Sequence, residues 1–111
     1  MKRVVWVGSA LEELRGLPEK AHRRAGFELH QVQLGLAPSD WRPVPSVGPG
    51  VAELRIHAAG EHRVLYVARF AEAIYVLHVF EKKTRKITKR DLDLVRARLS
   101  LVNVRRGTGS S

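Results

Sequence analysis

The sequence contains no cysteine and no long apolar run. Without cysteine, disulfides, thiolate catalysis and cysteine-ligated zinc are excluded, and a reducing compartment fits best. The apolar run near the N-terminus is limited to Val4–Val7, which is too short for the core of a signal peptide. No stretch approaches the ~20 residues that a membrane-spanning helix needs. We therefore expect a cytoplasmic protein with no membrane partner.

Acidic residues are also scarce. The 111 residues include 11 Asp and Glu against 20 Lys and Arg, which gives a formal net charge of +9. A small chain with this excess is expected to bind an anion, whether nucleic acid, an anionic membrane or an acidic protein. The length predicts one domain with its own core. We place that domain at residues 1–104 and expect residues 105–111 to form a disordered tail.

Common catalytic signatures are missing as well. The sequence has no His-Glu-x-x-His motif, no Walker-type glycine loop and no obvious catalytic pair of carboxylates. Ser9 and Ser39 lack the surroundings of a serine nucleophile. His57 and His62 are separated by a predicted turn, so we do not expect them to bind a metal together. The sequence therefore predicts neither a metal nor another cofactor.

What the sequence does contain is three apolar runs rich in β-prone residues, Val51–Ala58, His62–Phe70 and Ala73–Phe80. Short links join them, Ala59–Glu61 and Ala71–Glu72. Short β-prone runs joined in this way are typical of antiparallel hairpins. The pattern therefore predicts a three-stranded meander.

The flanking regions predict one more strand and three helices. The expected elements are a strand at Arg3–Val7, a helix opened by a Ser9-x-x-Glu12 capping box, a helix from Pro18 to about Gly35, and a helix from Lys89 to Val102 opened by Thr88-x-x-Asp91. Residues 37–50 contain four prolines and two glycines, so we expect an irregular loop there. We expect the helices to cover one face of the sheet and to leave the other for function.

A dense basic run follows the third predicted strand. Six of the nine residues in Lys82–Arg90 are cationic and none is acidic. Because side chains alternate along a strand, Arg55 should lie on the face opposite Leu54 and Ile56. The candidate site that follows is a phosphate pocket of Arg55, Arg63, His78, Lys82 and Lys83. The plainer alternative is that His78 is a half-buried sheet histidine and that the charges solvate strand ends.

Such a pocket would suit RNA cleavage by attack of the 2′-hydroxyl. That reaction needs a base, an acid and stabilisation of charge at the phosphate. Arg55 and Arg63 would hold the phosphate, because arginine is not usefully deprotonated. A lysine with a pKa lowered by neighbouring cations, or His78, would exchange protons. No metal is required.

Residues 51–102 resemble the RelE/ParE toxin superfamily, particularly its phage-derived, HigB-like branch. The matching stretches are Glu53-Leu54-Arg55, His62-Arg63-Val64-Leu65-Tyr66, the Tyr75–Lys86 segment YVLHVFEKKTRK, and the predicted Arg90–Leu99 helix. The resemblance implies an α+β fold in which a twisted antiparallel sheet, the meander plus the N-terminal strand, packs on two N-terminal helices, with a third helix at the C-terminus.

The resemblance also implies a type II toxin that cleaves mRNA, usually on the ribosome, and that is paired with a small helix-turn-helix antitoxin. Arg63 matches the family's catalytic arginine, and Lys82 and Lys83 fall near its later basic residue. The remaining cations of the basic run would bind RNA: Arg85, Lys86, Lys89 and Arg90. Many relatives carry a functional tyrosine near the C-terminus. This chain has none after Tyr75, so its proton transfer must differ. Two alternatives stay open, a non-catalytic ParE-like gyrase inhibitor and a nucleic-acid-binding phage accessory protein.

Overall fold

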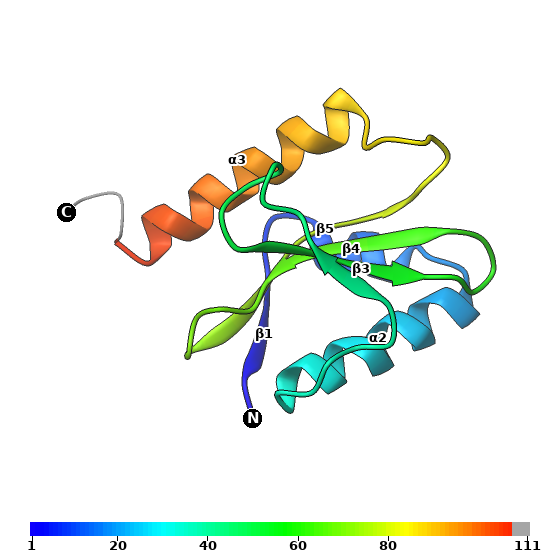
Figure 1. Ribbon diagram of the computed structural model, residues 1–111, viewed down its shortest axis with the longest axis horizontal. Helices are drawn as coiled ribbons and strands as arrows, with labels where there is room; N and C mark the ends of the chain where they lie inside the picture. The colour runs from blue at the N-terminus through cyan, green and yellow to red at the C-terminus, as the bar shows by residue number, and fades with distance from the viewer. Residues whose placement is uncertain (108–111) are drawn as a thin grey trace.

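The computed structural model describes residues 1–107 and shows an α+β architecture (Figure 1). The elements are β1 (Arg3–Trp6), α1 (Ala10–Arg15), α2 (Glu19–Gln33), β2 (Trp41–Pro43), β3 (Val51–Ile56), β4 (His62–Val67), β5 (Ala73–Glu81) and α3 (Lys89–Arg105). The five strands form one sheet in the order β1-β5-β4-β3-β2. The predicted meander is confirmed, since β3, β4 and β5 pair antiparallel in sequence order.

The sheet differs from the prediction at both edges. At one edge β1 pairs parallel to β5, so the sheet is mixed and not antiparallel throughout. Residue alternation does not reveal strand direction, because both directions have the same two-residue period. At the other edge Trp41–Pro43, expected to be irregular, form β2 and pair antiparallel with β3. An edge strand tolerates proline, since one side of it needs no ladder bond.

Helices cover both faces of the sheet, which corrects the expectation of one free face. On the first face α1 and α2 bury Val64 and Tyr66 of β4. On the second face α3 packs over residues that include Leu65 and Val67 of the same strand. All six residues of β4 are buried, as expected for a strand covered on both sides. In Figure 1 α3 crosses the sheet on the side away from α2.

The two predicted capping boxes have different outcomes. The Thr88 hydroxyl accepts a hydrogen bond from the Asp91 amide at 3.1 Å, so the cap of α3 is confirmed. Ser9 precedes α1 but makes no side-chain cap bond. Its hydroxyl donates to Glu13 at 3.1 Å and accepts from Arg98 at 2.8 Å. The predicted Ser9-x-x-Glu12 capping box is therefore wrong, because the Ser9 hydroxyl is hydrogen-bonded to the side chains of Glu13 and Arg98 and not to the backbone of α1.

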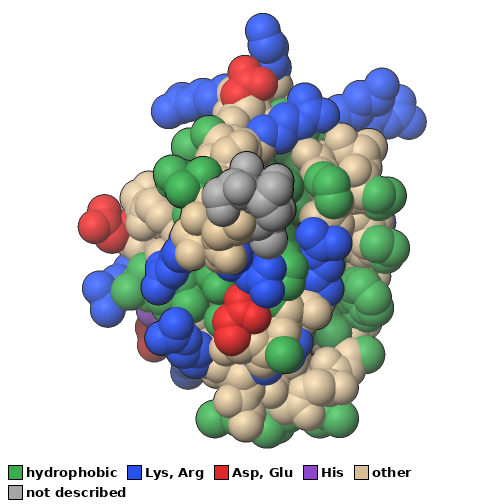
Figure 2. Space-filling model, turned by 90° about the vertical axis from the view of Figure 1, so that its left-hand side faces the viewer, with side chains coloured by type: hydrophobic (Ala, Val, Ile, Leu, Met, Phe, Trp, Pro, Cys, Tyr) green, Lys and Arg blue, Asp and Glu red, His purple; other side chains and the backbone are tan. Residues whose placement is uncertain are grey.

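The ordered structure extends past the predicted boundary at residue 104. Arg105 ends α3, and the Arg106 guanidinium lies 2.6 Å from Glu72 and 3.5 Å from the centroid of the Phe70 ring. The rest of the predicted tail, residues 108–111, lies outside the described residues. Figure 2 shows this end of the molecule, where Lys and Arg side chains are spread over the visible surface. Within residues 1–107, none of the helices is long and apolar enough to cross a membrane.

Candidate functional site

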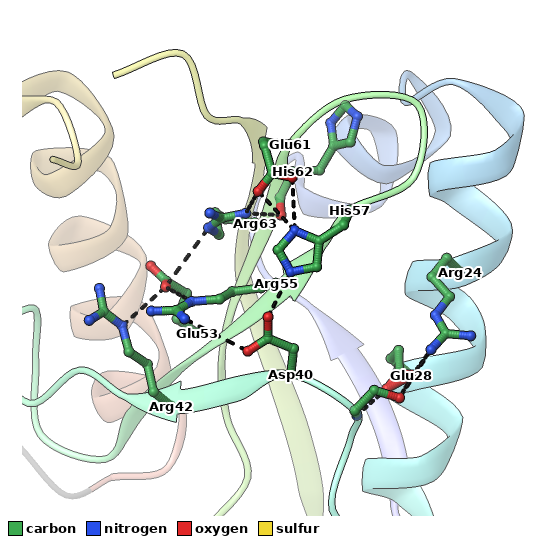
Figure 3. Close-up of polar contacts among 11 residues, drawn as sticks. Arg24, Glu28, Asp40, Arg42, Glu53, Arg55, His57, Glu61, His62 and Arg63 are labelled. Carbon is green, nitrogen blue, oxygen red and sulfur yellow. Dashed lines mark hydrogen bonds and ion pairs between the residues drawn. The ribbon is translucent and has the colours of Figure 1, made fainter. Parts of the chain in front are cut away.

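Three arginines surround one buried carboxylate on the second face of the sheet (Figure 3). The Glu53 side chain in β3 is only 9% exposed. Its Oε1 lies 3.2 Å from the Nε of Arg55, 3.3 Å from the Nε of Arg42 and 3.9 Å from the Nε of Arg63. Strand register produces the cluster, because Arg42 pairs with Glu53 and Arg55 pairs with Arg63 across neighbouring strands. Three guanidinium groups thus share one carboxylate, which leaves a local excess of positive charge.

Six charged side chains close a ring of alternating sign around this cluster. We call it the charge ring; its members in order are Asp40, His57, Glu61, Arg63, Glu53 and Arg55. His57 closes it, with Nε2 2.6 Å from Asp40 and Nδ1 2.8 Å from Glu61. Glu61 in turn accepts from Nη1 of Arg63 at 3.1 Å. Each cation of the ring therefore faces two carboxylates, which fixes its direction.

The hydrogen bonds define the protonation state of His57. A carboxylate only accepts hydrogen bonds, so the pairing of both ring nitrogens of His57 with carboxylates favours the imidazolium form. The hydrogen bond to Asp40, followed by that to Glu61, raises the pKa of His57. The same pairing, together with Arg63, lowers the pKa of Glu61. The hydrogen bonds on the exposed side of the charge ring thus favour the ionised forms of both His57 and Glu61.

Arg63 is more deeply placed than the sequence suggested. Arg63 stands near the start of β4, where a charged side chain could reach solvent, but it is only 7% exposed. Nη1 donates to the backbone oxygen of His62 at 3.0 Å in addition to Glu61. Nε has no hydrogen-bond partner among the residues that the structure describes. An unsatisfied buried donor is uncommon, and this one lies 3.9 Å from the Glu53 carboxylate.

His78 belongs to a second cluster that joins three elements. Nδ1 lies 2.9 Å from Glu13 of α1 and Nε2 lies 2.8 Å from Asp91 of α3. Arg98 of α3 also donates to Glu13, at 3.0 Å, and to the backbone oxygen of Leu77. Leu77 is the extra residue of a β-bulge, because Leu65 pairs with His78 whereas Tyr66 pairs with Val76. We call these side chains, Glu13, His78, Asp91 and Arg98, the histidine clamp.

Both nitrogens of His78 face carboxylates, an arrangement that again favours the imidazolium form. Burial opposes the charged form, but the hydrogen bonds to Glu13 and Asp91 outweigh it and raise the pKa of His78. Burial likewise opposes ionisation of Glu13, yet its bonds to His78 and Arg98 lower its pKa to about 2. His78 is only 5% exposed. The two carboxylates therefore favour a proton on both nitrogens of the His78 ring.

A family model described as phage-derived protein Gp49-like matches residues 12–100. The chain belongs to this Gp49-like family. The family is part of the RelE/ParE-like toxin superfamily and is related to the toxins of toxin–antitoxin systems. The matched region runs from α1 to α3 and includes the charge ring and the histidine clamp. No curated protein matches the chain.

The Gp49-like fold brings together only part of the predicted pocket. Arg55 and Arg63 lie side by side, whereas the nitrogens of His78 are held in the histidine clamp. Phe80 stands between them, since it pairs in register with Arg63 and stacks on the His78 ring at 4.8 Å. We call residues 82–88, between β5 and α3, the basic loop. The Lys82 amide donates to the Glu61 backbone oxygen at 2.8 Å, which joins the basic loop to the β3–β4 hairpin.

The other predicted cations line or flank that loop. Lys83 pairs with Glu81 at 3.4 Å. The RNA-binding candidates Arg85, Lys86, Lys89 and Arg90 are exposed, in the loop or in the first turn of α3. Within residues 1–107, no group of three or more metal-ligating side chains is present.

Sequence patterns gave no role to Asp40, Arg42, Glu53 or Glu61 of this Gp49-like protein, and Asp40 and Arg42 lie in residues 37–50, which were expected to be irregular. Glu53 entered only as part of the Glu53-Leu54-Arg55 match. A buried glutamate two residues from an arginine on one strand face was the available signal, since a carboxylate there needs a cationic partner.

Proposed function

We propose that this Gp49-like protein is the HigB-like toxin of a type II toxin–antitoxin pair and cleaves mRNA, on the ribosome, by metal-independent attack of the 2′-hydroxyl. The observation that carries the proposal is the pairing of Arg55 with Arg63 on adjacent strands, above the buried Glu53. Two guanidinium groups on one sheet face can hold a phosphodiester and stabilise the added charge of its transition state. Family membership supports a toxin role.

In the proposed mechanism the RNA phosphate replaces carboxylates of the charge ring. Asp40 and Glu61 are 40% and 47% exposed and can move away, whereas the buried Glu53 stays and orients the arginines. Lys82 and Lys83 are the candidates for proton transfer beside the cleaved bond. His78 is assigned to positioning, because accepting a proton would first require it to lose the one that Glu13 and Asp91 hold.

The basic loop supplies the remaining contacts to the RNA backbone. Arg85, Lys86, Lys89 and Arg90 are exposed and lie downstream of Lys82 on the same chain segment. Contacts of this kind carry affinity and little sequence preference. The proposed partners are thus mRNA, the ribosome and a small helix-turn-helix antitoxin, and the proposed location is the cytoplasm.

A second candidate is the non-catalytic ParE-like inhibitor of gyrase. It is favoured by the charge ring itself, because both predicted phosphate-binding arginines already face carboxylates. A surface of fixed alternating charges is also suited to recognition of a protein.

Expression of the chain without a partner distinguishes the two functions. We expect growth arrest, loss of translation and new mRNA 5′ ends inside translated regions, detected by primer extension. Intact mRNA together with relaxed or broken DNA would favour the gyrase inhibitor. Growth without arrest, with folded protein present, would contradict both.

A further inference from the structure

Phe80 is an aromatic side chain beside the candidate phosphate-binding arginines. It lies in β5, half-buried, on the sheet face that carries the charge ring. Its register partner on the neighbouring strand β4 is Arg63. Directly opposed residues of antiparallel strands have Cβ atoms about 4.5–5.5 Å apart. An aromatic ring therefore lies immediately beside the candidate phosphate-binding arginine.

The orientation of the Phe80 ring is fixed from one side. Its plane lies 21° from that of His78, with the ring centroids 4.8 Å apart. His78 is itself held by Glu13 and Asp91 and is almost completely buried. The inner face of Phe80 is thus covered by an immobilised imidazolium, and a planar ligand would have to stack from the outer side.

A hollow of about 450 Å³ opens next to this ring. The cationic side chains on its wall are Lys82, Lys83 and Arg90, and Thr84 and Thr88 add hydroxyl groups. Three acids, Glu13, Glu81 and Asp91, also line it together with His78 and Leu94, although Glu13 and Asp91 are engaged with His78. A volume in the range of about 300–1,000 Å³ is typical of small-ligand sites. The hollow therefore combines an aromatic surface, cations and enough space for one nucleoside.

We infer that Phe80 is a stacking platform for one nucleobase of the bound RNA, the base adjacent to the phosphate held by Arg55 and Arg63. Single-stranded nucleic acid is held by this combination of a basic groove and an aromatic face, and stacking tolerates any base. Lys82, Lys83 and Arg90 then contact the neighbouring phosphates. The inference rests on the proposed RNA-directed function and adds a base-binding position to it.

The test uses a short 2′-O-methyl oligoribonucleotide, which the protein cannot cleave by 2′-hydroxyl attack. One position carries the fluorescent base 2-aminopurine, which is quenched when it stacks, and the label is moved along the strand. We expect quenching at one register with the wild-type protein and with Phe80→Tyr. Phe80→Leu should lose the quenching and bind about 5–150-fold more weakly, the effect of one stacked base.

Two comparisons separate stacking from a packing role of Phe80. Removing the base at the quenched position should weaken wild-type binding by a similar factor but leave Phe80→Leu binding unchanged. Phe70→Leu is the matched control, because Phe70 packs against Tyr75 and Arg106. A folded Phe80→Leu protein with wild-type affinity and quenching would overturn the inference. So would wild-type binding that is indifferent to the missing base, which decides the matter even if Phe80→Leu does not fold.

The outcome is independent of catalysis. Cleavage of RNA with free 2′-hydroxyls is measured separately, so quenching without cleavage would retain the platform and reject the nuclease. Cleavage without a stacked base at any register would retain the nuclease and reject the stacking platform.

Discussion

Arg63 is the residue on which the proposed chemistry depends most. Its guanidinium is held by Glu61 and by the His62 backbone oxygen, with Nε directed at Glu53. We expect Arg63→Ala to lower mRNA cleavage by about 10²–10³-fold, the usual effect of removing one donor to a developing charge. Arg63→Lys should recover only part of the cleavage activity, because lysine keeps the positive charge but cannot bind two phosphate oxygens at once as a guanidinium does. Primer extension and growth curves measure both.

Because Arg63 is buried, each variant must first be shown to fold by a thermal melt. Arg23→Ala is the matched control, since Arg23 is an exposed arginine on α2 whose side chain is 71% exposed. Arg63→Ala that is folded and cuts mRNA at the wild-type rate would remove this residue from the site.

Glu53 gives a second prediction at the residue scale. The carboxylate is buried and faces three arginines, so Glu53→Gln removes the buried counter-ion that they share, although Arg55 keeps Asp40 and Arg63 keeps Glu61. Removing one partner of a buried ion pair costs about 3–5 kcal/mol, and the neutral isostere should fall at or below the lower end. Urea unfolding measures the loss, and inorganic phosphate should restore part of it. Glu19→Gln, at an exposed pair on α2, should change nothing.

A stable Glu53→Gln protein, insensitive to phosphate, would show that the arginines do not depend on this carboxylate.

At the scale of elements, the histidine clamp joins α1, β5 and α3 and should make stability depend on pH. The folded-state pKa of His78 is raised, so its contribution is complete below the unfolded value of about 6.5 and is lost as pH rises through the folded value. The pKa of Glu13 is lowered to about 2 from 4.5, so its contribution is lost as pH falls from 4.5 towards 2. The free energy of unfolding should therefore decline on both sides of mildly acidic pH.

His57 also has a raised pKa and adds to the alkaline decline, so the comparison must isolate His78. The difference in unfolding free energy between wild type and His78→Gln should shrink as pH rises from 6 to 9. His30→Gln, at an exposed position in α2, is the control for loss of a histidine outside the clamp. A constant difference for His78→Gln would mean that the clamp does not hold a proton.

The same scale shows what sequence patterns can and cannot predict. Alternation identified β3, β4 and β5 and placed Leu54 and Ile56 opposite Arg55, because a two-residue period is local information. The pairing of β1 with β5 and the strand at Trp41–Pro43 were not predictable, since they depend on partners distant in sequence. Alternation correctly places His78 on the face of Arg63, but hydrogen bonds to Glu13 and Asp91, which are distant in sequence, hold the His78 ring, so its expected convergence with Arg55 and Arg63 did not follow.

At the scale of the whole molecule, the net charge of +9 predicts salt-sensitive binding to RNA. Each phosphate neutralised on a single strand contributes about −0.7 to the slope of log affinity against log salt, because condensed counterions are released. If roughly five or six phosphates are contacted, affinity should fall about 10²-fold between about 50 and 200 mM salt. Filter binding or fluorescence anisotropy with a non-cleavable oligoribonucleotide measures the slope.

The location of the slope-determining charges can be tested in the same assay. Cations are spread widely over the surface, as Figure 2 shows for one end, so total charge alone would make all of them equivalent. If the basic loop contacts the RNA backbone, Arg85→Gln and Lys86→Gln should each reduce the slope by about 0.7, whereas Arg23→Gln should leave it unchanged. Only direct neutralisation of a phosphate releases counterions at a defined position. Equal small effects of all three substitutions on the slope would therefore indicate a diffuse attraction and would contradict the phosphate-binding role of Lys82–Arg90.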